Sequence, residues 1–264
     1  MSSKIPKILI IAGSDSCGGA GIQADIKTAA AHQVHSSSAI TCLTAQNTCG
    51  VFAIHHAPID FLRKQIEVVL NDISFDAIKI GMLGNAEIID VVADVLSNVK
   101  DIPVILDSVM VATSGDVLLE KEAVSSLKSK LINGCRIVTP NIDEAEILAQ
   151  TSIKTVADMK KAAMKIKSFG AQNVLIKGGH LDSQDSKIKN ILLDEAGKFH
   201  LITNKKVEGS QFHGTGCTLS TSIACNIVKG FEIDKAVRKS NAFVYRSIIA
   251  NMKIGKGSSI LKNF

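Results

Sequence analysis

The sequence has few aromatic residues and few prolines, and it contains no long apolar run. Its 264 residues include no Trp, one Tyr and four Pro. With 46% hydrophobic and 21% charged residues, the composition excludes a disordered or collagen-like chain. No apolar stretch approaches the roughly 18 residues that a membrane-spanning helix needs. We therefore expect one soluble globular domain over residues 1–264, without a membrane partner.

The sequence also lacks a basic block, a CxxC pair and the GxxxxGK[ST] phosphate-binding loop. The formal charge of +5 is spread along the chain, and aromatic residues amount to 4%. A nucleic-acid partner is not expected, because such surfaces use clustered Lys and Arg with stacking rings. The six cysteines have no metal-ligand spacing, so we expect free thiols in a reducing cytoplasm.

Apolar runs of strand length alternate with stretches of helical periodicity, a pattern typical of a mostly parallel sheet covered by helices on both faces. Strands are predicted at 8–12, 38–43, 77–80, 104–107, 136–139 and 173–177, with a short edge hairpin over 191–202. Helices are predicted at 58–70, 86–96, 122–131, 157–169, 215–228 and 233–249, and the tail after them is expected to fray. In such an α/β fold, ligands bind at the carboxyl ends of the strands.

A glycine-rich turn follows the first predicted strand, in IAGSDSCGGAGIQAD. Glycine permits close backbone approach, so a substrate there would meet exposed amides; a tight structural turn is the alternative. Gly19, Gly21 and Ala24 also match the dinucleotide-binding GxGxxA pattern. That pattern needs an acidic residue about 20 positions further on, and none occurs between Asp25 and Asp60, which argues against an oxidoreductase.

The motif HGTGC leads into an apolar helix and comprises residues 213–217. Unpartnered amides of Gly214, Thr215 and Gly216 at a helix start favour a phosphate. The same field predicts that the Cys217 thiol ionises more readily than a free cysteine, although most free cysteines are buried apolar residues. For His213, a structural hydrogen bond and a catalytic role are equally compatible with the sequence.

Polar residues close successive predicted strands, namely Asp107, Asn141, Glu144 and Lys177. Carboxylates and an amide at one sheet edge suit Mg²⁺, bound directly or through water, while a lysine neutralises phosphate. Asn141 and Glu144 have the spacing of a helix capping box, which is the structural alternative.

Gln46 ends the second predicted strand in LTAQNT. A carboxamide offers a donor beside an acceptor and can pair with an aminopyrimidine edge; a loop hydrogen bond is the alternative. Met82 in KIGML can flank a flat ring or fill the core.

Together, the motifs resemble the hydroxymethylpyrimidine and phosphomethylpyrimidine kinases of thiamine biosynthesis, in the ribokinase-like superfamily. The segments that carry the resemblance are IAGSDSCGGAGIQADIKT, ITCLTAQNT, IKIGML, LDSVMV, VTPN with Glu144, LIKGGH and HGTGCTLS. The resemblance implies a three-layer sandwich, ATP and Mg²⁺ as cofactors, a homodimer, and two phosphorylations, first of the hydroxymethyl group and then of the monophosphate.

The resemblance also implies roles for individual residues. It places Gln46 on the pyrimidine, in a pocket lined by Asp25, Ala20, Met82 and Val109. It makes Gly214, Thr215 and Gly216 the anion hole and Cys217 the proton acceptor of the first step. Asp107, Asn141, Glu144 and Lys177 would serve Mg²⁺ and the nucleotide phosphates.

Several positions depart from the family pattern, and other functions remain open. The departures are Ser108, Thr113, Asp143 and Phe212, where the family usually has proline, lysine, proline and threonine. The nearest alternative is a pyridoxal kinase on the same scaffold. Two others are a hydrolase with Cys217 as nucleophile and a regulator that binds a pyrimidine or a nucleotide without turnover.

Overall fold

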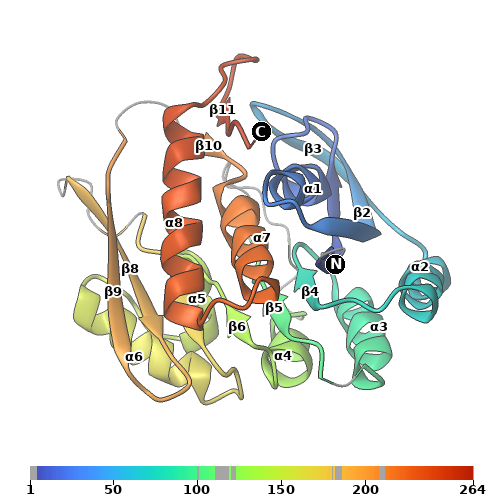
Figure 1. Cartoon of the computed structure of the whole chain (residues 1–264), viewed down its shortest axis with the longest axis horizontal. Helices are drawn as coiled ribbons and strands as arrows, with labels where there is room; N and C mark the ends of the chain where they lie inside the picture. The colour runs from blue at the N-terminus through green and yellow to red at the C-terminus, as the bar shows by residue number, and fades with distance from the viewer. Residues whose placement is uncertain are drawn as a thin grey trace.

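The computed structural model describes residues 5–99, 101–110, 119, 123–179, 181, 186–207 and 212–263. One nine-stranded sheet runs through the molecule in the order β3-β2-β1-β4-β5-β6-β7-β8-β9 (Figure 1). Its parallel centre consists of β1 (Lys7–Asp15), β2 (His35–Asn47), β4 (Ala77–Ile80), β5 (Val104–Leu106), β6 (Ile137–Val138) and β7 (Val174–Ile176). Antiparallel pairing occurs at the edges, through β3 (Gly50–His56), β8 (Lys187–Leu193) and β9 (Phe199–Lys205).

Helices cover both faces of the sheet and bury a separate apolar cluster on each (Figure 1). Along β1, Leu9 and Ile11 belong to one cluster, whereas Ile8 and Ile10 belong to the other, as the alternation of a strand requires. One layer consists of α1 (Gly21–Ala31), α7 (Thr215–Val228) and α8 (Ile233–Ile249). The other contains α2 (Ile59–Asp72), α3 (Ala86–Ser97), α4 (Ala123–Ser126), the π-helix η1 (Leu127–Ile132), α5 (Ile142–Ala149) and α6 (Val156–Lys167). The expected three-layer arrangement is confirmed.

The predicted strands and helices correspond to elements of the structure, but some strands were not predicted and the tail differs from expectation. Strand β3 was not predicted, because its exposed Phe52 and Ala53 conceal the apolar alternation of a strand. The prediction of a fraying tail was wrong. Strand β11 (Ser259–Ile260) pairs with β10 (Phe212–His213), and the Asn263 amide donates to the hydroxyls of Thr28 and Thr218. Thr113 lies outside the described residues.

A buried ion pair connects β4 to the helices on one face of the sheet. Lys79 Nζ lies 2.7 Å from Asp25 Oδ2, and both side chains are fully buried. The Thr221 hydroxyl donates to Asp25 Oδ1 at 2.7 Å. Because an unpaired charge at such a site is costly, these three residues hold β4, α1 and α7 in one relative position.

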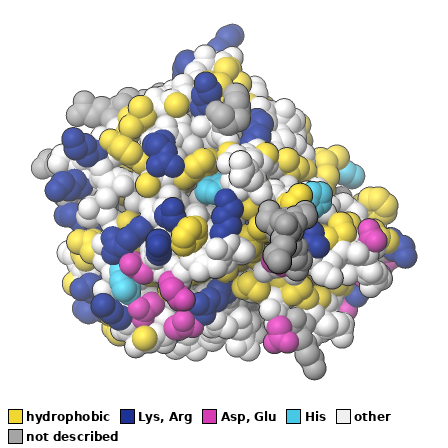
Figure 2. All heavy atoms as spheres, in the orientation of Figure 1, with side chains coloured by type: hydrophobic (Ala, Val, Ile, Leu, Met, Phe, Trp, Pro, Cys, Tyr) yellow, Lys and Arg dark blue, Asp and Glu magenta, His cyan; other side chains and the backbone are white. Residues whose placement is uncertain are grey.

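The charged surface mixes both signs. On the face shown in Figure 2, Lys and Arg side chains are interspersed with acidic and apolar groups. Among the pairs on the described surface, Arg238 Nε lies 2.9 Å from Asp234, and His200 Nε2 lies 2.6 Å from Asp194. Within the described ranges, no helix combines the length and the apolar character required to cross a bilayer.

His32 gives the fold a testable pH dependence. Its Nε2 lies 2.9 Å from the Ser222 hydroxyl, and its ring packs against Phe243. Burial lowers the pKa of His32 from 6.5 to about 4, and the charges of Lys229 and Arg246 add to the shift. Between these two values the unfolded chain binds more protons than the folded one, so stability falls as pH falls through that window.

We expect the free energy of unfolding to drop by about 1–2 kcal/mol between pH 7 and pH 4.5 through this group, after allowing for its partial exposure. Urea denaturation of the wild type and of His32→Asn at both pH values measures the contribution. The variant is expected to lose less stability than the wild type on acidification. Equal losses would show that His32 does not produce the effect.

Candidate active site

The start of α7 and the turn after β1 are in direct backbone contact. Gly214, the N-cap of α7, has φ 87°, and a Cβ at this position would lie 1.9 Å from the carbonyl oxygen of Gly19. Only glycine fits such an approach. The backbone amide of Gly21 also hydrogen-bonds to the Cys217 thiol. The two glycine-containing motifs of the sequence therefore form a single site.

The first turn of α7 has the properties of an anion site. Its N-cap supplies no side-chain hydrogen bond, and the first turn contains no acidic residue. Thr215, Gly216 and Cys217 are partly exposed. Unpartnered amides at a helix start, together with roughly half a positive charge from the helix dipole, favour a phosphate oxygen.

Charged side chains from β5, β7 and α5 converge beside this turn. Lys177 Nζ lies 3.0 Å from Asp107 Oδ1 and 3.9 Å from Glu144 Oε2. A Cβ at Gly216 would lie 3.4 Å from both Asp107 Oδ2 and Lys177 Nζ, which places the pair next to the anion site. A parallel bridge between Asn141 and Lys177 brings the ends of β6 and β7 together. Four strand-end residues thus meet, as their positions in the sequence indicated.

The two carboxylates of this cluster differ in their pKa values. Burial would raise the pKa of Asp107, but Lys177, Lys79 and the hydrogen bond from Thr139 hold it below the usual value. Burial raises the pKa of Glu144 to about 7; Asp107 adds to this rise, and Lys177 opposes it. At neutral pH Asp107 is therefore ionised, whereas Glu144 is partly protonated.

The capping box of α5 is present. The Asn141 side chain accepts from the Glu144 amide at 2.9 Å, and Glu144 Oε2 accepts from the Asn141 amide at 2.8 Å. Both residues therefore organise the junction between β6 and α5.

The donor set fits a magnesium ion that shares its coordination with phosphate and water. Asp107 and Glu144 supply carboxylate oxygens, and no group of three or more potential ligands occurs among the described residues. Mg²⁺ in nucleotide sites is commonly held by one or two carboxylates together with phosphate oxygens and water. The arrangement does not suit a cation held by protein ligands alone.

The prediction of an easily ionised Cys217 was wrong. Burial raises the pKa of this thiol to about 12; Lys79 opposes the rise, while Asp25 and Asp107 add to it. The desolvation cost and the nearby carboxylates outweigh the field at the start of α7. In the ligand-free protein, Cys217 is a neutral thiol.

The turn after β1 differs from expectation in a second way, because an acidic side chain already binds its amides. Asp15 accepts hydrogen bonds from the amides of Cys17, Gly19 and Ala20 at 2.8, 3.0 and 2.8 Å. These amides are not available to a ligand. Asp15 was not among the predicted site residues, although an Asp just before a glycine-rich turn is a known signal for this kind of capping.

The five residues assigned to the pyrimidine pocket fall into two groups. Gln46, Ala20 and Val109 are partly exposed. Met82 is 8% exposed, and its sulfur lies 3.9 Å from that of Cys42. Asp25 is fully buried and bound to Lys79 and Thr221, so a direct contact with a substrate is not supported.

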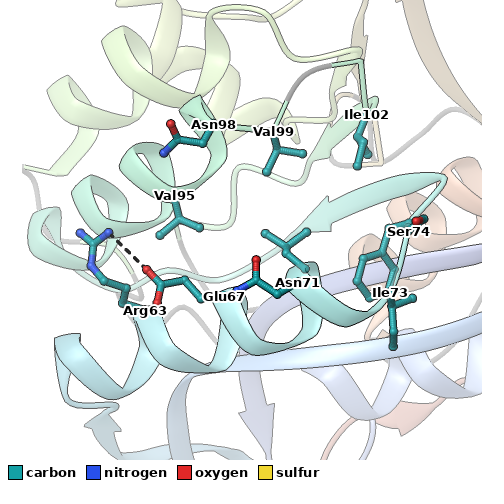
Figure 3. Close-up of a pocket in the computed structure, with 11 residues that line it drawn as sticks. Arg63, Glu67, Asn71, Ile73, Ser74, Val95, Asn98, Val99 and Ile102 are labelled. Atoms are coloured by element: carbon teal, nitrogen blue, oxygen red, sulfur yellow. Dashed lines mark ion pairs between the residues drawn. The ribbon is translucent and has the colours of Figure 1, made fainter.

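A cavity of about 440 Å³ lies elsewhere, between α2 and α3 (Figure 3). It is lined by residues such as Ile73 and Ile102, which precede β4 and β5. It therefore lies at the amino ends of the strands, away from the convergent polar groups described above. Arg63 and Glu67 line the same cavity, and Arg63 Nη1 lies 4.0 Å from Glu67 Oε1.

The fold and the site define a ribokinase-like phosphotransferase, and comparisons with known proteins give the family. The profile described as "Phosphomethylpyrimidine kinase" matches residues 15–262. A hydroxymethylpyrimidine/phosphomethylpyrimidine kinase of Haemophilus influenzae is 43% identical over 97% of this chain and 95% of the relative. The chain belongs to the phosphomethylpyrimidine kinase family.

Solved structures show the same fold. The pyridoxal kinase of Staphylococcus aureus in complex with ADP has a TM-score of 0.91 at 32% identity, covering 99% of this chain and 94% of that one. The phosphomethylpyrimidine kinase of Clostridium difficile has a TM-score of 0.80 at 41% identity, covering 93% of this chain and 100% of that one.

Proposed function

We propose that this protein transfers the terminal phosphate of ATP first to 4-amino-5-hydroxymethyl-2-methylpyrimidine and then to the monophosphate that results, as a step of thiamine biosynthesis. The observation that carries the proposal is the meeting of three groups at one sheet edge. These are the uncapped start of α7, the Lys177–Asp107 pair and the Gln46 carboxamide. Family membership and the ADP complex of a structural neighbour support ATP as the donor.

In this mechanism the residues of the chain act mainly by position and charge. The amides of Gly214, Thr215 and Gly216 receive the oxygens of the transferred phosphate, and Lys177 neutralises its charge. Asp107 holds Lys177 beside the first turn of α7. Asp107 and Glu144 would hold Mg²⁺ directly or through water, and the ion would supply further charge neutralisation at the phosphates.

A pyridoxal kinase is the second candidate, and one observation favours it. The TM-score is higher with the Staphylococcus aureus pyridoxal kinase than with the Clostridium difficile phosphomethylpyrimidine kinase, although the sequence identity is higher with the latter. A carboxamide at position 46 matches an aminopyrimidine edge, with its donor and acceptor side by side. Pyridoxal presents a phenolic oxygen and an aldehyde at that edge instead.

The choice between these functions is testable by ADP release with three substrates offered in parallel. We expect turnover with hydroxymethylpyrimidine and with its monophosphate, and kcat/KM for pyridoxal at least tenfold lower, since one mismatched polar edge costs roughly 1–3 kcal/mol. A preference for pyridoxal would select the second candidate. Ligand binding without any ADP release would select the non-catalytic regulator.

Cys217→Ala tests whether the thiol accepts a proton. Only the first phosphorylation requires the loss of an alcohol proton, so a thiolate base would make the variant selectively slow in that step. Because the thiol is neutral in the ligand-free site, we expect both steps to slow by similar factors. Single-turnover rates for the two substrates measure this, and a selective loss of the first step would restore the base role.

Further properties of the chain are proposed on the same basis. We propose that it acts in the cytoplasm as one kinase domain and forms a homodimer. The β2–β3 hairpin supports the dimer, because Leu43 and Phe52 are 53% and 71% exposed. In Figure 2, apolar side chains are visible on the right of the molecule, where Figure 1 places β2. Sedimentation equilibrium of the wild type and of Phe52→Ser tests this, and a wild-type monomer would contradict it.

A further inference from the structure

Two residues beside the candidate site, Asp15 and His213, are joined to Gln46 and have no role in the mechanism above. His213 Nε2 lies 2.9 Å from Asp15 Oδ2 and 3.0 Å from the atom drawn as Gln46 Nε2. The atom drawn as Gln46 Oε1 lies 3.0 Å from Thr44 Oγ1. Thr44 Oγ1 in turn donates to the carbonyl oxygen of Ser14 at 3.0 Å. The five groups form one continuous chain of hydrogen bonds.

The ionisation of Asp15 determines whether His213 Nε2 carries a hydrogen. Burial would raise the pKa of its carboxyl, but hydrogen bonds from His213 and from the Ala20 and Cys17 amides hold it below the usual value. An ionised carboxylate only accepts hydrogen bonds. His213 Nε2 must therefore carry a hydrogen, and it has no lone pair left to accept one.

The orientation of Gln46 follows in the same way. A nitrogen that carries a hydrogen cannot accept from the carboxamide NH₂, so the oxygen of Gln46 must face His213, where it shares the single Nε2 hydrogen with Asp15 Oδ2 in a three-centre hydrogen bond. The NH₂ group then faces Thr44, whose only hydrogen is already given to Ser14 and whose oxygen accepts. The orientation drawn in the structure, with Gln46 Nε2 toward His213 and Oε1 toward Thr44, sets two donors against each other and requires two hydrogens from one hydroxyl, so we reverse it. The two ends of a carboxamide have nearly the same shape, and hydrogen bonding decides between them.

We propose that Asp15 and His213 are positioning residues that fix the direction of the Gln46 carboxamide and thereby the polar edge of the heterocycle that the protein accepts. This inference rests on the proposed function. Of the four hydrogen-bonding sites of Gln46, His213 and Thr44 occupy two. One acceptor and one donor remain for a ligand, and the acceptor is on the His213 side.

This direction matters because His213 immediately precedes the anion site at the start of α7. In the pyrimidine substrate, the amino group lies between the hydroxymethyl group and a ring nitrogen. When the amino group donates to the Gln46 oxygen and the ring nitrogen accepts from its NH₂ group, the hydroxymethyl group is directed toward α7. A reversed carboxamide would pair with the ring the other way round and direct the reacting group away from the phosphate.

The 4-oxo analogue of the substrate tests the proposal, because it presents an acceptor and an N–H in place of the amino group and the ring nitrogen. In wild type, kcat/KM should favour the amino compound over the oxo analogue. Asp15→Asn and His213→Phe should lower this ratio by roughly tenfold or more, since the carboxamide is then free to reverse. Thr44→Val should lower it as well, whereas Thr44→Ser, which keeps the hydroxyl, should retain it.

A purely structural role would lower the rates with both compounds in parallel and leave the ratio unchanged, and that result would overturn the proposal. The ¹⁵N shifts of the His213 ring in the ligand-free wild type provide a second test that needs no turnover. A hydrogen on Nε2 is expected, and a ring protonated on Nδ1 alone would overturn the proposal. If wild type phosphorylates neither pyrimidine, the proposed function fails, while the ring measurement still decides the orientation.

Discussion

The close approach of Gly214 to Gly19 is the constraint on which the rest of the site depends. A side chain at position 214 would occupy the space of the Gly19 carbonyl oxygen, 1.9 Å from its Cβ. Because the two backbones touch, the uncapped start of α7 lies directly beside the turn after β1. The same contact sets Cys217 against the Gly21 amide and brings β10 within reach of β11. The contact thereby fixes a short separation between the proposed phosphate site and the proposed heterocycle site.

The buried charges near this contact are not balanced. Lys79 and Lys177 face three carboxylates, those of Asp25, Asp107 and Glu144. Burial, with a smaller contribution from Asp107, raises the pKa of Glu144 to about 7, so that this group is partly neutral. A cation arriving with a nucleotide would favour the ionised form of Glu144. The charges of the site therefore suit a cation that binds together with the phosphate of the proposed reaction.

Sequence patterns were sufficient to predict which residues come together when those residues lie at the ends of strands. Asp107, Asn141 and Lys177 end buried strands, and parallel strands bring their carboxyl ends to one edge, so their meeting was predictable. The pairing of Phe212 with Ser259 was not predictable, because two-residue strands far apart in the chain leave no periodic signal. The ion pair of Lys79 was not predictable either, because nothing in its buried strand indicates that the partner carboxylate, Asp25, comes from α1.

Cys217 shows why a local field argument was insufficient at the centre of the site. Position at a helix start favours the thiolate, but burial and the charges of Asp25 and Asp107 favour the thiol more strongly. The carboxylates that hold the two lysines in place thus also suppress a resident base. Phosphoryl transfer passes through a loose transition state that gains most from fixed positive charge and alignment. A site with a neutral thiol, lysines paired with carboxylates, and helix amides is consistent with that chemistry.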